Sequence, residues 1–169
     1  MKVFGVGLSR TGTVSLTKAL QRLRLRALHY PRLDEVLRKA RRYDALTDVT
    51  VIPHYKELAR LYPDAKFVLT VRGESSWLAS CEGHWGRNPL ERKSKWSVCG
   101  RVFVYGVGVF DAGLFAYVRQ RHHDDVRQHF RGSDRLLELN VCVGEGYGKL
   151  CPFLGMDVLE EVFPHANKG

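Results

Sequence analysis

The residues most able to do chemistry lie in one short polar segment near the N-terminus, Ser9 to Ser15, which reads Ser-Arg-Thr-Gly-Thr-Val-Ser. An apolar stretch typical of a buried strand precedes it, and apolar residues at helical spacing follow it. A loop between a strand and a helix presents free backbone N–H groups at the positive end of the helix dipole. The segment therefore predicts an anion site, in which Arg10 adds a cation and Gly12 allows close approach of the backbone. Further contacts are expected from Ser9, Thr11, Thr13, Val14 and Ser15.

Two nucleotide-binding motifs come close to this loop without matching it. Gly7 and Gly12 have the spacing of GxxxxGK[ST], but Thr13 stands where that motif needs the Lys that contacts a γ-phosphate. The pattern GxGxxG starts at Gly5 and then fails, because residue 10 is Arg. The anion expected in this loop is therefore neither the γ-phosphate of ATP nor the pyrophosphate of NAD.

The elements that must position this loop alternate between strands and helices. Apolar and β-branched runs predict strands over Lys2–Leu8, Tyr43–Val51, Lys66–Val71 and Leu136–Val141. Helical spacing predicts helices over 15–28, 33–42, 53–61, 74–82 and 148–154, with one or two more in 98–130 and an irregular stretch over 84–97. This alternation indicates a three-layer α/β fold with a mainly parallel central sheet. No linker divides the chain, so we expect one domain over residues 1–169.

Composition narrows the class of protein further. The chain has 169 residues and a formal net charge of +9. Its first 60 residues hold 13 Lys or Arg against 5 Asp or Glu, which favours an anionic partner such as a nucleotide, a phosphate-bearing small molecule or a nucleic acid. Alternatively, these cations only solvate helix faces. The four cysteines form no CxxC pair, so neither a zinc site nor a disulfide framework is expected.

Location is predicted from what the sequence does not contain. No apolar run approaches the roughly 20 residues of a membrane helix, and the N-terminal apolar stretch is too short for a signal peptide. We therefore expect a cytoplasmic protein with no membrane partner. The adjacent pair His122-His123 is expected at a solvated helix end rather than in a metal site, because no Cys or acidic cluster completes a ligand set.

Several segments together resemble a known family, the P-loop sulfotransferases, in the branch that carries RTGTxSL. The loop Arg10-Thr11-Gly12-Thr13-x-Ser15-Leu16 is similar to the 5′-phosphosulfate loop of that family. The stretch 62–72, ending in Arg72 and followed eight residues later by Ser80, is similar to its second signature. Leu150-Cys151-Pro152-Phe153-Leu154-Gly155 and Phe163-Pro164-His165-x-Asn167 also match. The resemblance spans nearly the whole chain.

The resemblance implies a sulfuryl donor and its binding residues. The family uses 3′-phosphoadenosine 5′-phosphosulfate (PAPS) and releases adenosine 3′,5′-bisphosphate, and it needs no metal. The 5′-phosphosulfate would lie on residues 9–15, with Arg10 taking the place of a Lys found in many relatives. Arg72 and Ser80 would face the 3′-phosphate, a task that suits the planar guanidinium. For Trp77, core packing is favoured over stacking on adenine.

The acceptor group needs a base to remove its proton. In many relatives a His lies at a strand end that precedes the signature Arg. Here Asp48 precedes Arg72 by nearly the same number of residues. Asp48 is therefore the first candidate for the general base and His54 the second. An ordinary Asp has a pKa of about 4, so burial must raise the pKa of Asp48 for this role. The alternative is that Asp48 orients the loop or caps the next helix.

The acceptor region is expected over residues 84–117, whose aromatic residues line a pocket for a small molecule or form the core of a helical cap. Three other functions stay open. A P-loop small-molecule kinase could use the strand ending at Asp48, a non-catalytic domain could bind anions or nucleic acid, and a degenerate sulfotransferase could bind the donor product without chemistry. The last alternative follows from the absence of the RKGxxG segment. A small-molecule acceptor is favoured over nucleic acid as the partner, and both a monomer and a homodimer stay open.

Overall fold

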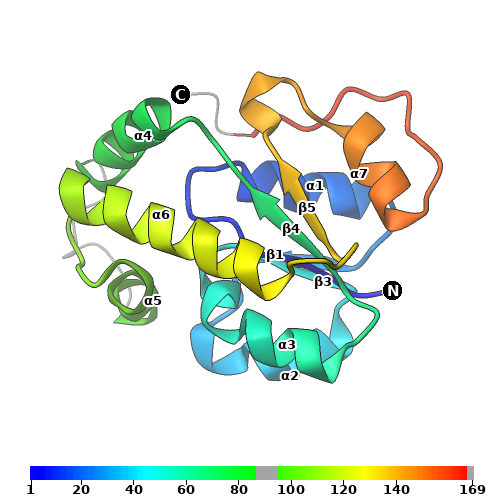
Figure 1. The fold of residues 1–169 in the computed structure, drawn as a ribbon, viewed down its shortest axis with the longest axis horizontal. Helices are drawn as coiled ribbons and strands as arrows, with labels where there is room; N and C mark the ends of the chain where they lie inside the picture. Colours follow the sequence, from blue (N-terminus) through cyan, green and yellow to red (C-terminus); the bar gives the residue numbers. More distant parts are fainter. Residues whose placement is uncertain (87–94, 167–169) are drawn as a thin grey trace.

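The computed structural model describes residues 1–86 and 95–166. Its centre is a sheet of five strands in the order β2-β3-β1-β4-β5, and every neighbouring pair is parallel (Figure 1). This confirms the α/β class and the parallel sheet. The strands are β1 (Val3–Gly5), β2 (Ala27–His29), β3 (Ala45–Thr47), β4 (Lys66–Thr70) and β5 (Leu136–Leu139).

The described residues form seven helices around this sheet. They are α1 (Thr13–Arg22), α2 (Val36–Arg42), α3 (Tyr55–Leu61), α4 (Glu74–Gly86), α5 (Lys95–Tyr105), α6 (Ala112–His129) and α7 (Tyr147–Leu154), with short 3-10 turns at Leu33–Glu35, Val49–His54 and Val141–Val143. None of these helices combines the length and the apolar composition that crossing a membrane requires.

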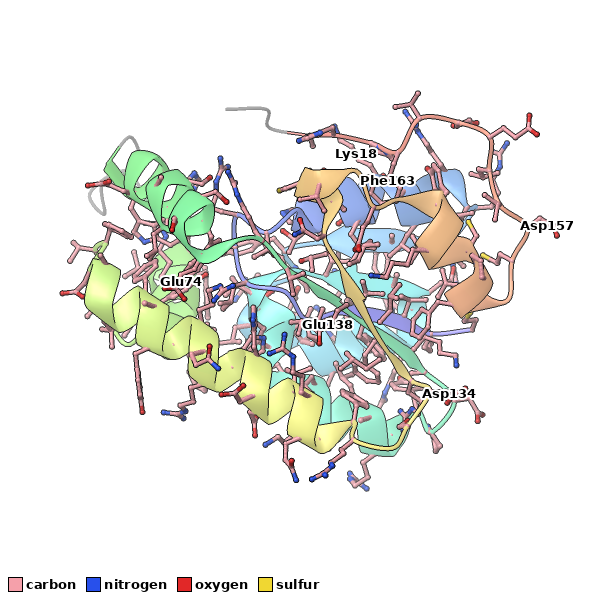
Figure 2. The ribbon with its side chains drawn as sticks, turned by 45° about the horizontal axis from the view of Figure 1, so that its top comes forward. Lys18, Glu74, Asp134, Glu138, Asp157 and Phe163 are labelled. Atoms are coloured by element: carbon pink, nitrogen blue, oxygen red, sulfur yellow. The ribbon has the colours of Figure 1, made fainter. Side chains whose placement is uncertain are left out.

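Alternate strand residues build two cores on the two faces of the sheet, because successive side chains of a strand point to opposite sides. Val3 and Val68 pack with α1 and α7 on one face. Phe4 and Phe67 pack with α2, α3 and the end of α6 on the other. An ion pair between Arg127 of α6 and Glu138 of β5, 2.7 Å long, ties the second layer to the edge strand. Figure 2 labels Glu138 on this strand.

A third core lies beyond the carboxyl ends of the strands. Trp77 and Trp85 of α4, Tyr105 of α5 and Phe115 of α6 are buried together against Leu8, which precedes the polar loop. The rings of Tyr105 and Phe115 stack with centroids 4.4 Å apart. The helices α4, α5 and α6 thus form a lobe on one side of the loop (Figure 1).

Several element boundaries differ from the sequence-based expectation. The first helix ends at Arg22 rather than near 28, because Arg24 takes a left-handed φ of 63° and the chain turns back into the strand β2. This three-residue strand was not expected, since it is too short to show a period and is held by pairing with β3. The expected strand 43–51 keeps only Ala45–Thr47, because Asp48 leaves the extended region with φ 90°.

The region 98–130 contains two helices, as one of the alternatives predicted. Gly106 takes φ 77° after α5, and the Asp111 side chain caps α6 by accepting a 2.7 Å hydrogen bond from Leu114 N. Gly155 ends α7 with φ 67°, which confirms the expected glycine cap. Part of the stretch expected to be irregular, 84–97, belongs to α4 and α5, and its middle lies outside the described residues.

Candidate functional site

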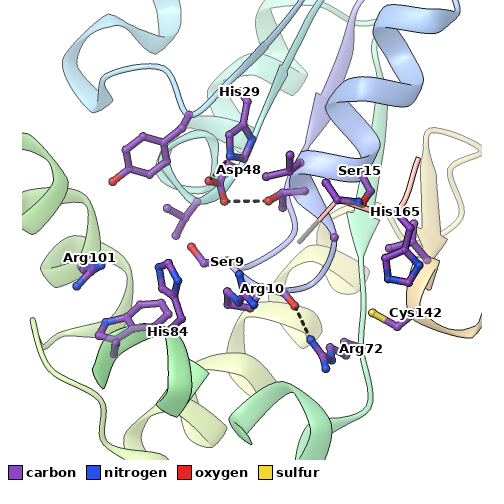
Figure 3. Close-up of a pocket in the computed structure, with 18 of the residues that line it drawn as sticks. Ser9, Arg10, Ser15, His29, Asp48, Arg72, His84, Arg101, Cys142 and His165 are labelled. Carbon is purple, nitrogen blue, oxygen red and sulfur yellow. Dashed lines mark hydrogen bonds and ion pairs between the residues drawn. The ribbon is translucent and has the colours of Figure 1, made fainter. Parts of the chain in front are cut away.

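A cavity of about 380 Å³ opens where the polar loop meets the carboxyl ends of β3 and β4 (Figure 3). Parallel α/β sheets bind ligands at this end, because loops and helix N-termini converge there. The following residues line it: Ser9, Arg10, Gly12, Thr13, Val14, Ser15, His29, Tyr30, Asp48, Val49, Arg72, His84, Trp85, Ser97, Arg101, Val141, Cys142, His165 and Ala166. Six of the seven loop residues expected to bind an anion are among them.

The backbone of the loop has the shape of an anion site. Gly12 precedes α1 with φ 106°, and the first helical hydrogen bond runs from Leu16 N to Gly12 O at 3.0 Å. The amides of residues 12–15 therefore lie ahead of the helical ladder, at the positive end of the helix dipole. Glycine is required at position 12, because a Cβ there would overlap with Val141 as well as strain the backbone.

The loop hydroxyls divide between internal and cavity-facing roles. Thr11 is buried and donates its proton to Leu8 O at 2.6 Å. Contrary to expectation, its hydroxyl therefore shapes the loop and does not face the cavity. Thr13 donates to Asp48 Oδ1 at 3.3 Å. Ser15 accepts a 3.0 Å hydrogen bond from Ala166 N, which brings the C-terminal segment across the loop.

Three side chains from the helices of the lobe hold the loop and the segment before it in place. Trp77 Nε1 donates to Ser9 O at 2.9 Å, and Ser9 N donates to the Tyr105 hydroxyl at 3.1 Å. Trp77 is fully buried, which confirms its expected role in the core. His122 Nε2 bonds to Val6 O at 2.7 Å, and burial lowers the pKa of His122.

The adjacent histidines therefore do not lie at a solvated helix end, as the sequence had indicated. Both are buried on the face of α6 that packs against the sheet. Burial lowers the pKa of His123 to about 4, with smaller contributions from Arg119 and His122. In the part of the chain that the structure describes, no three His, Cys, Asp or Glu side chains group as metal ligands.

Two cations from distant parts of the chain meet at the loop. Arg10 has a left-handed φ of 70° and its Nε donates to Ser80 Oγ at 3.0 Å. Arg72 Nη1 donates to the carbonyl oxygen of Arg10 at 3.4 Å, and its Nε donates to Ser76 Oγ at 3.2 Å. The expected partnership of Arg72 with Ser80 is thus replaced, since Ser80 orients Arg10 while Ser76 orients Arg72. Arg72 lines the cavity, whereas Ser80 supports it from α4.

Asp48 is the acidic residue that the structure brings to the cavity wall. It is 6% exposed, and burial raises its pKa, against the opposing effects of His29, the Val49 amide and the Thr13 hydroxyl. Its φ of 90° with ψ 176° lies in a region that is essentially restricted to glycine. A strained backbone at a cavity wall is typical of functional positions.

Sequence reasoning missed His29, which lies at the end of the unexpected strand β2. Its Nε2 is 3.2 Å from Asp48 Oδ2, and its side chain is 30% exposed into the cavity. Only the pairing of β2 with β3, which aligns His29 with Thr47, brings it beside Asp48. His54, the second expected base, lies outside the cavity lining, where its Nε2 contacts Leu33 O at 3.0 Å. The structure thus removes His54 from the site.

The cavity has two ends with different side chains (Figure 3). Arg72, Cys142 and His165 lie at one end, and His84 and Arg101 at the other. Asp48 and His29 lie above the loop between them. The Arg101 guanidinium stacks 4.8 Å from the centre of the Trp85 ring.

The region 84–117 is a mixture of cavity wall, core and surface. His84 and Trp85 line the cavity, and Tyr105 and Phe115 are core. Three other aromatic residues of this region are exposed, namely Trp96, Phe103 and Tyr117.

The C-terminal segment completes the wall. Phe163 packs edge-on against Tyr147 of α7, with ring centroids 4.9 Å apart (Figure 2). Arg22 of α1 donates to Val162 O at 2.8 Å. These contacts carry His165 and Ala166 to the cavity, while Asn167 of the same motif lies outside the described residues.

The fold and cavity define an α/β protein in which a polar loop at a helix N-terminus, three arginines and a buried carboxylate line one pocket. A family model described as a sulfotransferase domain matches residues 2–41 and 30–169. The chain therefore belongs to the sulfotransferase domain family, as its motifs indicated. It is also similar to Ava biosynthesis cluster protein M of Aspergillus versicolor, with 28% identity over 214 positions that cover 98% of this chain and 80% of that protein.

Proposed function

We propose that this protein transfers the sulfuryl group of PAPS to a hydroxyl or amine of a small-molecule acceptor. The observation that carries the proposal is that one cavity of about 380 Å³ contains both the anion loop and the buried carboxylate of Asp48. Binding sites for small molecules have volumes of about 300–1,000 Å³. The reacting groups of a donor and an acceptor would thus meet between the loop and Asp48.

The donor half of the proposal rests on the loop amides and the two arginines. Sulfuryl transfer, like phosphoryl transfer, builds negative charge on the bridging oxygen of the leaving group, so that donors aimed at this oxygen accelerate the reaction. Arg10 and the amides of residues 12–15 would hold the 5′-phosphosulfate. Arg72 would hold the 3′-phosphate, at the end of the cavity that it shares with His165.

The acceptor half rests on Asp48. A carboxylate whose pKa is raised by burial accepts a proton better than an exposed one does, and Asp48 meets this condition. The end of the cavity with His84, Trp85 and Arg101 would receive the acceptor. A small-molecule acceptor also agrees with the relative, whose name places it in a biosynthesis cluster.

The first experiment is a thermal-shift titration with adenosine 3′,5′-bisphosphate in EDTA, beside AMP and Mg-ATP. Ligand at about 100 times its dissociation constant stabilises the folded state by roughly 2.7 kcal/mol, which raises the melting temperature by a few degrees. We expect the bisphosphate to act without magnesium and more strongly than AMP. A shift with Mg-ATP alone would favour a kinase and overturn the proposal.

The second experiment tests for chemistry. The protein is incubated with PAPS labelled in its sulfur, together with phenols, alcohols and amines, and labelled products are separated. Transfer to any of them supports the proposal, whereas tight bisphosphate binding without transfer favours the non-catalytic alternative. Salt-sensitive binding of RNA or DNA that the bisphosphate does not compete with would favour a nucleic-acid-binding domain.

A further inference from the structure

The strand β2 brings a histidine of the cavity wall against the proposed base. His29 Nε2 is 3.2 Å from Asp48 Oδ2, and Thr13 contacts the other oxygen, Oδ1, at 3.3 Å. The second ring nitrogen, Nδ1, lies 3.3 Å from the Thr47 hydroxyl and 3.4 Å from the Thr17 hydroxyl. Both nitrogens of His29 are therefore engaged by the protein, so His29 is not placed to take a proton from an acceptor.

The two threonines determine where the protons of His29 lie. Thr17 Oγ1 donates to the Thr13 carbonyl oxygen at 2.9 Å, and the Thr17 and Thr47 hydroxyl oxygens are 2.5 Å apart. Each hydroxyl has one proton. When the Thr17 proton goes to the carbonyl, the Thr47 proton lies between the two hydroxyls and neither is left for His29. In this arrangement His29 Nδ1 carries its own proton and donates it.

This count places a second proton between His29 and Asp48. A neutral histidine protonated at Nδ1 has a lone pair at Nε2, and Asp48 Oδ2 also presents lone pairs. The two atoms are at hydrogen-bond distance, so one proton lies between them. With that proton on His29, a histidine protonated at both nitrogens faces a carboxylate, and with it on Asp48, a neutral histidine faces a neutral carboxyl.

The positive charge on His29 opposes the effect of burial on Asp48. Burial raises the pKa of Asp48, and His29 acts in the opposite direction. Without the imidazolium, a buried carboxyl at this position would take up a proton from solvent and lose its capacity to act as a base. The structure thus couples the charge state of the proposed base to a residue on another strand.

We propose that His29 is the positioning residue for the sulfuryl-transfer reaction, holding Asp48 ionised with Oδ1 directed to the acceptor. This inference rests on the proposed function. In the reaction the acceptor oxygen or nitrogen bonds to sulfur, and the bond from sulfur to the bridging oxygen breaks. The electron pair of that bond stays on the phosphate, and the acceptor proton goes to Asp48 Oδ1.

Other charged groups near Asp48 bear on its titration. From α5, the Tyr105 hydroxyl stays neutral over the working range, because burial raises its pKa and the charge of Asp48 adds to the effect. From the 3-10 turn after β3, the Val49 amide donates to the carboxylate. The remaining titratable or charged groups that line the same cavity are Arg10, Tyr30, Arg72, His84, Arg101, Cys142 and His165.

The direct test is a titration of Asp48 by carbon-13 NMR of labelled aspartate, with Asp48→Asn used to assign the signal. In His29→Gln we expect the Asp48 midpoint to rise by about 1–3 pH units, the usual effect of an opposite charge at this distance. His129→Gln, which changes an exposed histidine of α6, serves as the control and leaves the midpoint in place. An unchanged midpoint in His29→Gln overturns the inference.

Nitrogen-15 NMR of labelled histidine gives a second, independent measurement. In the wild type near neutral pH we expect both His29 nitrogens to show the shifts of protonated nitrogen. In Asp48→Asn we expect one of the two to lose this signature. A single protonated nitrogen in the wild type contradicts the proton count.

Activity measurements connect the pair to the reaction. In a labelled-PAPS assay, with water or any acceptor found, His29→Ala should lower kcat about 10- to 100-fold, the range for one charged hydrogen bond. His29→Gln should recover part of this loss, because glutamine restores a hydrogen-bond donor. The acid limb of the pH–rate profile of His29→Gln should still lie at higher pH than that of the wild type. Equal losses in both variants, with an unshifted acid limb, contradict the positioning role.

Failure of the proposed function looks different from failure of this inference. If the wild type neither binds adenosine 3′,5′-bisphosphate nor turns over PAPS, the sulfotransferase proposal fails and the catalytic role of His29 fails with it. If the wild type turns over PAPS and His29→Gln matches it in kcat and pH profile, only the role of His29 fails.

Discussion

Arg72 and Arg10, which are 62 positions apart in the chain, meet through a 3.4 Å hydrogen bond from the Arg72 guanidinium to the Arg10 carbonyl oxygen. The bond joins the end of β4 to the polar loop after β1. Two cations that follow neighbouring strands are thus held at the carboxyl end of the sheet, each oriented by a serine of α4. This geometry suits a ligand with two anionic groups.

The first prediction concerns the discrimination between two nucleotides. Arg72→Ala should weaken binding of adenosine 3′,5′-bisphosphate by about 1.5–3 kcal/mol, the loss expected for a hydrogen bond to a charged group. AMP binding should barely change, because AMP has no 3′-phosphate. Calorimetric titration of both ligands measures the difference. Arg26→Ala is the matched control, since Arg26 pairs with Asp44 on the surface. Equal losses for both ligands in Arg72→Ala would show that Arg72 only shapes the loop.

The second prediction concerns the glycine that begins α1. Gly12→Ala should destabilise the fold and abolish bisphosphate binding, because the added Cβ overlaps with Val141 and the backbone has φ 106°. Gly132→Ala separates the two effects, since Gly132 also has a positive φ of 76° but open space around it. We expect about 1–2 kcal/mol from backbone strain alone in Gly132→Ala and a larger loss in Gly12→Ala. Urea unfolding measures both, and equal losses would contradict the close contact with Val141.

The third prediction uses the strained backbone of Asp48, with φ 90° and ψ 176°. Asp48→Gly and Asp48→Ala both remove the carboxylate and should both lose transferase activity. Glycine relieves strain of about 1–3 kcal/mol and loses about 0.5–1 kcal/mol through backbone entropy. Asp48→Gly should therefore be more stable than Asp48→Ala by about 1 kcal/mol. Denaturant titrations of the pair test this, and a more stable alanine variant would argue against the strain.

The fourth prediction concerns acid stability. The pKa of His123 is lowered to about 4 by burial, whereas an unfolded histidine has a pKa of about 6.5. At pH values below 6.5 the unfolded state binds this proton more tightly than the folded state does. The contribution of neutral His123 to the free energy of unfolding is therefore present above pH 6.5 and is lost as the pH falls toward 4. The free energy of unfolding should drop by about 3 kcal/mol more in the wild type than in His123→Leu over this range. His129→Leu serves as the control, and parallel pH curves for wild type and His123→Leu would contradict the neutral buried histidine.

The fold was predictable from local patterns where the elements are long and strongly apolar. The strand expected over Lys66–Val71 is present as Lys66–Thr70, and the helix after the polar loop was expected because of its apolar spacing. The strand Ala27–His29 was not expected, because three residues are too few to show a period. It is held by its hydrogen bonds to β3. The glycines and the capping residue Asp111, which indicate a break between α5 and α6, are visible in the sequence. The position of the break also depends on the packing of Tyr105 against Phe115, which only the structure shows.

The candidate site divides in the same way. The loop 9–15 as an anion site and the arginine at the strand end were predicted from local patterns alone, because backbone donors at a helix start and a strand-end arginine depend on local order. The choice of Asp48 as a base came from the resemblance to the sulfotransferases. Only the tertiary structure decided that Ser80 supports Arg10, that Thr11 is turned inward, and that His54 lies outside the cavity. Tertiary structure also placed His29 against Asp48. These relationships depend on strand order and on burial, which join residues far apart in the chain and which no local pattern of residue types encodes.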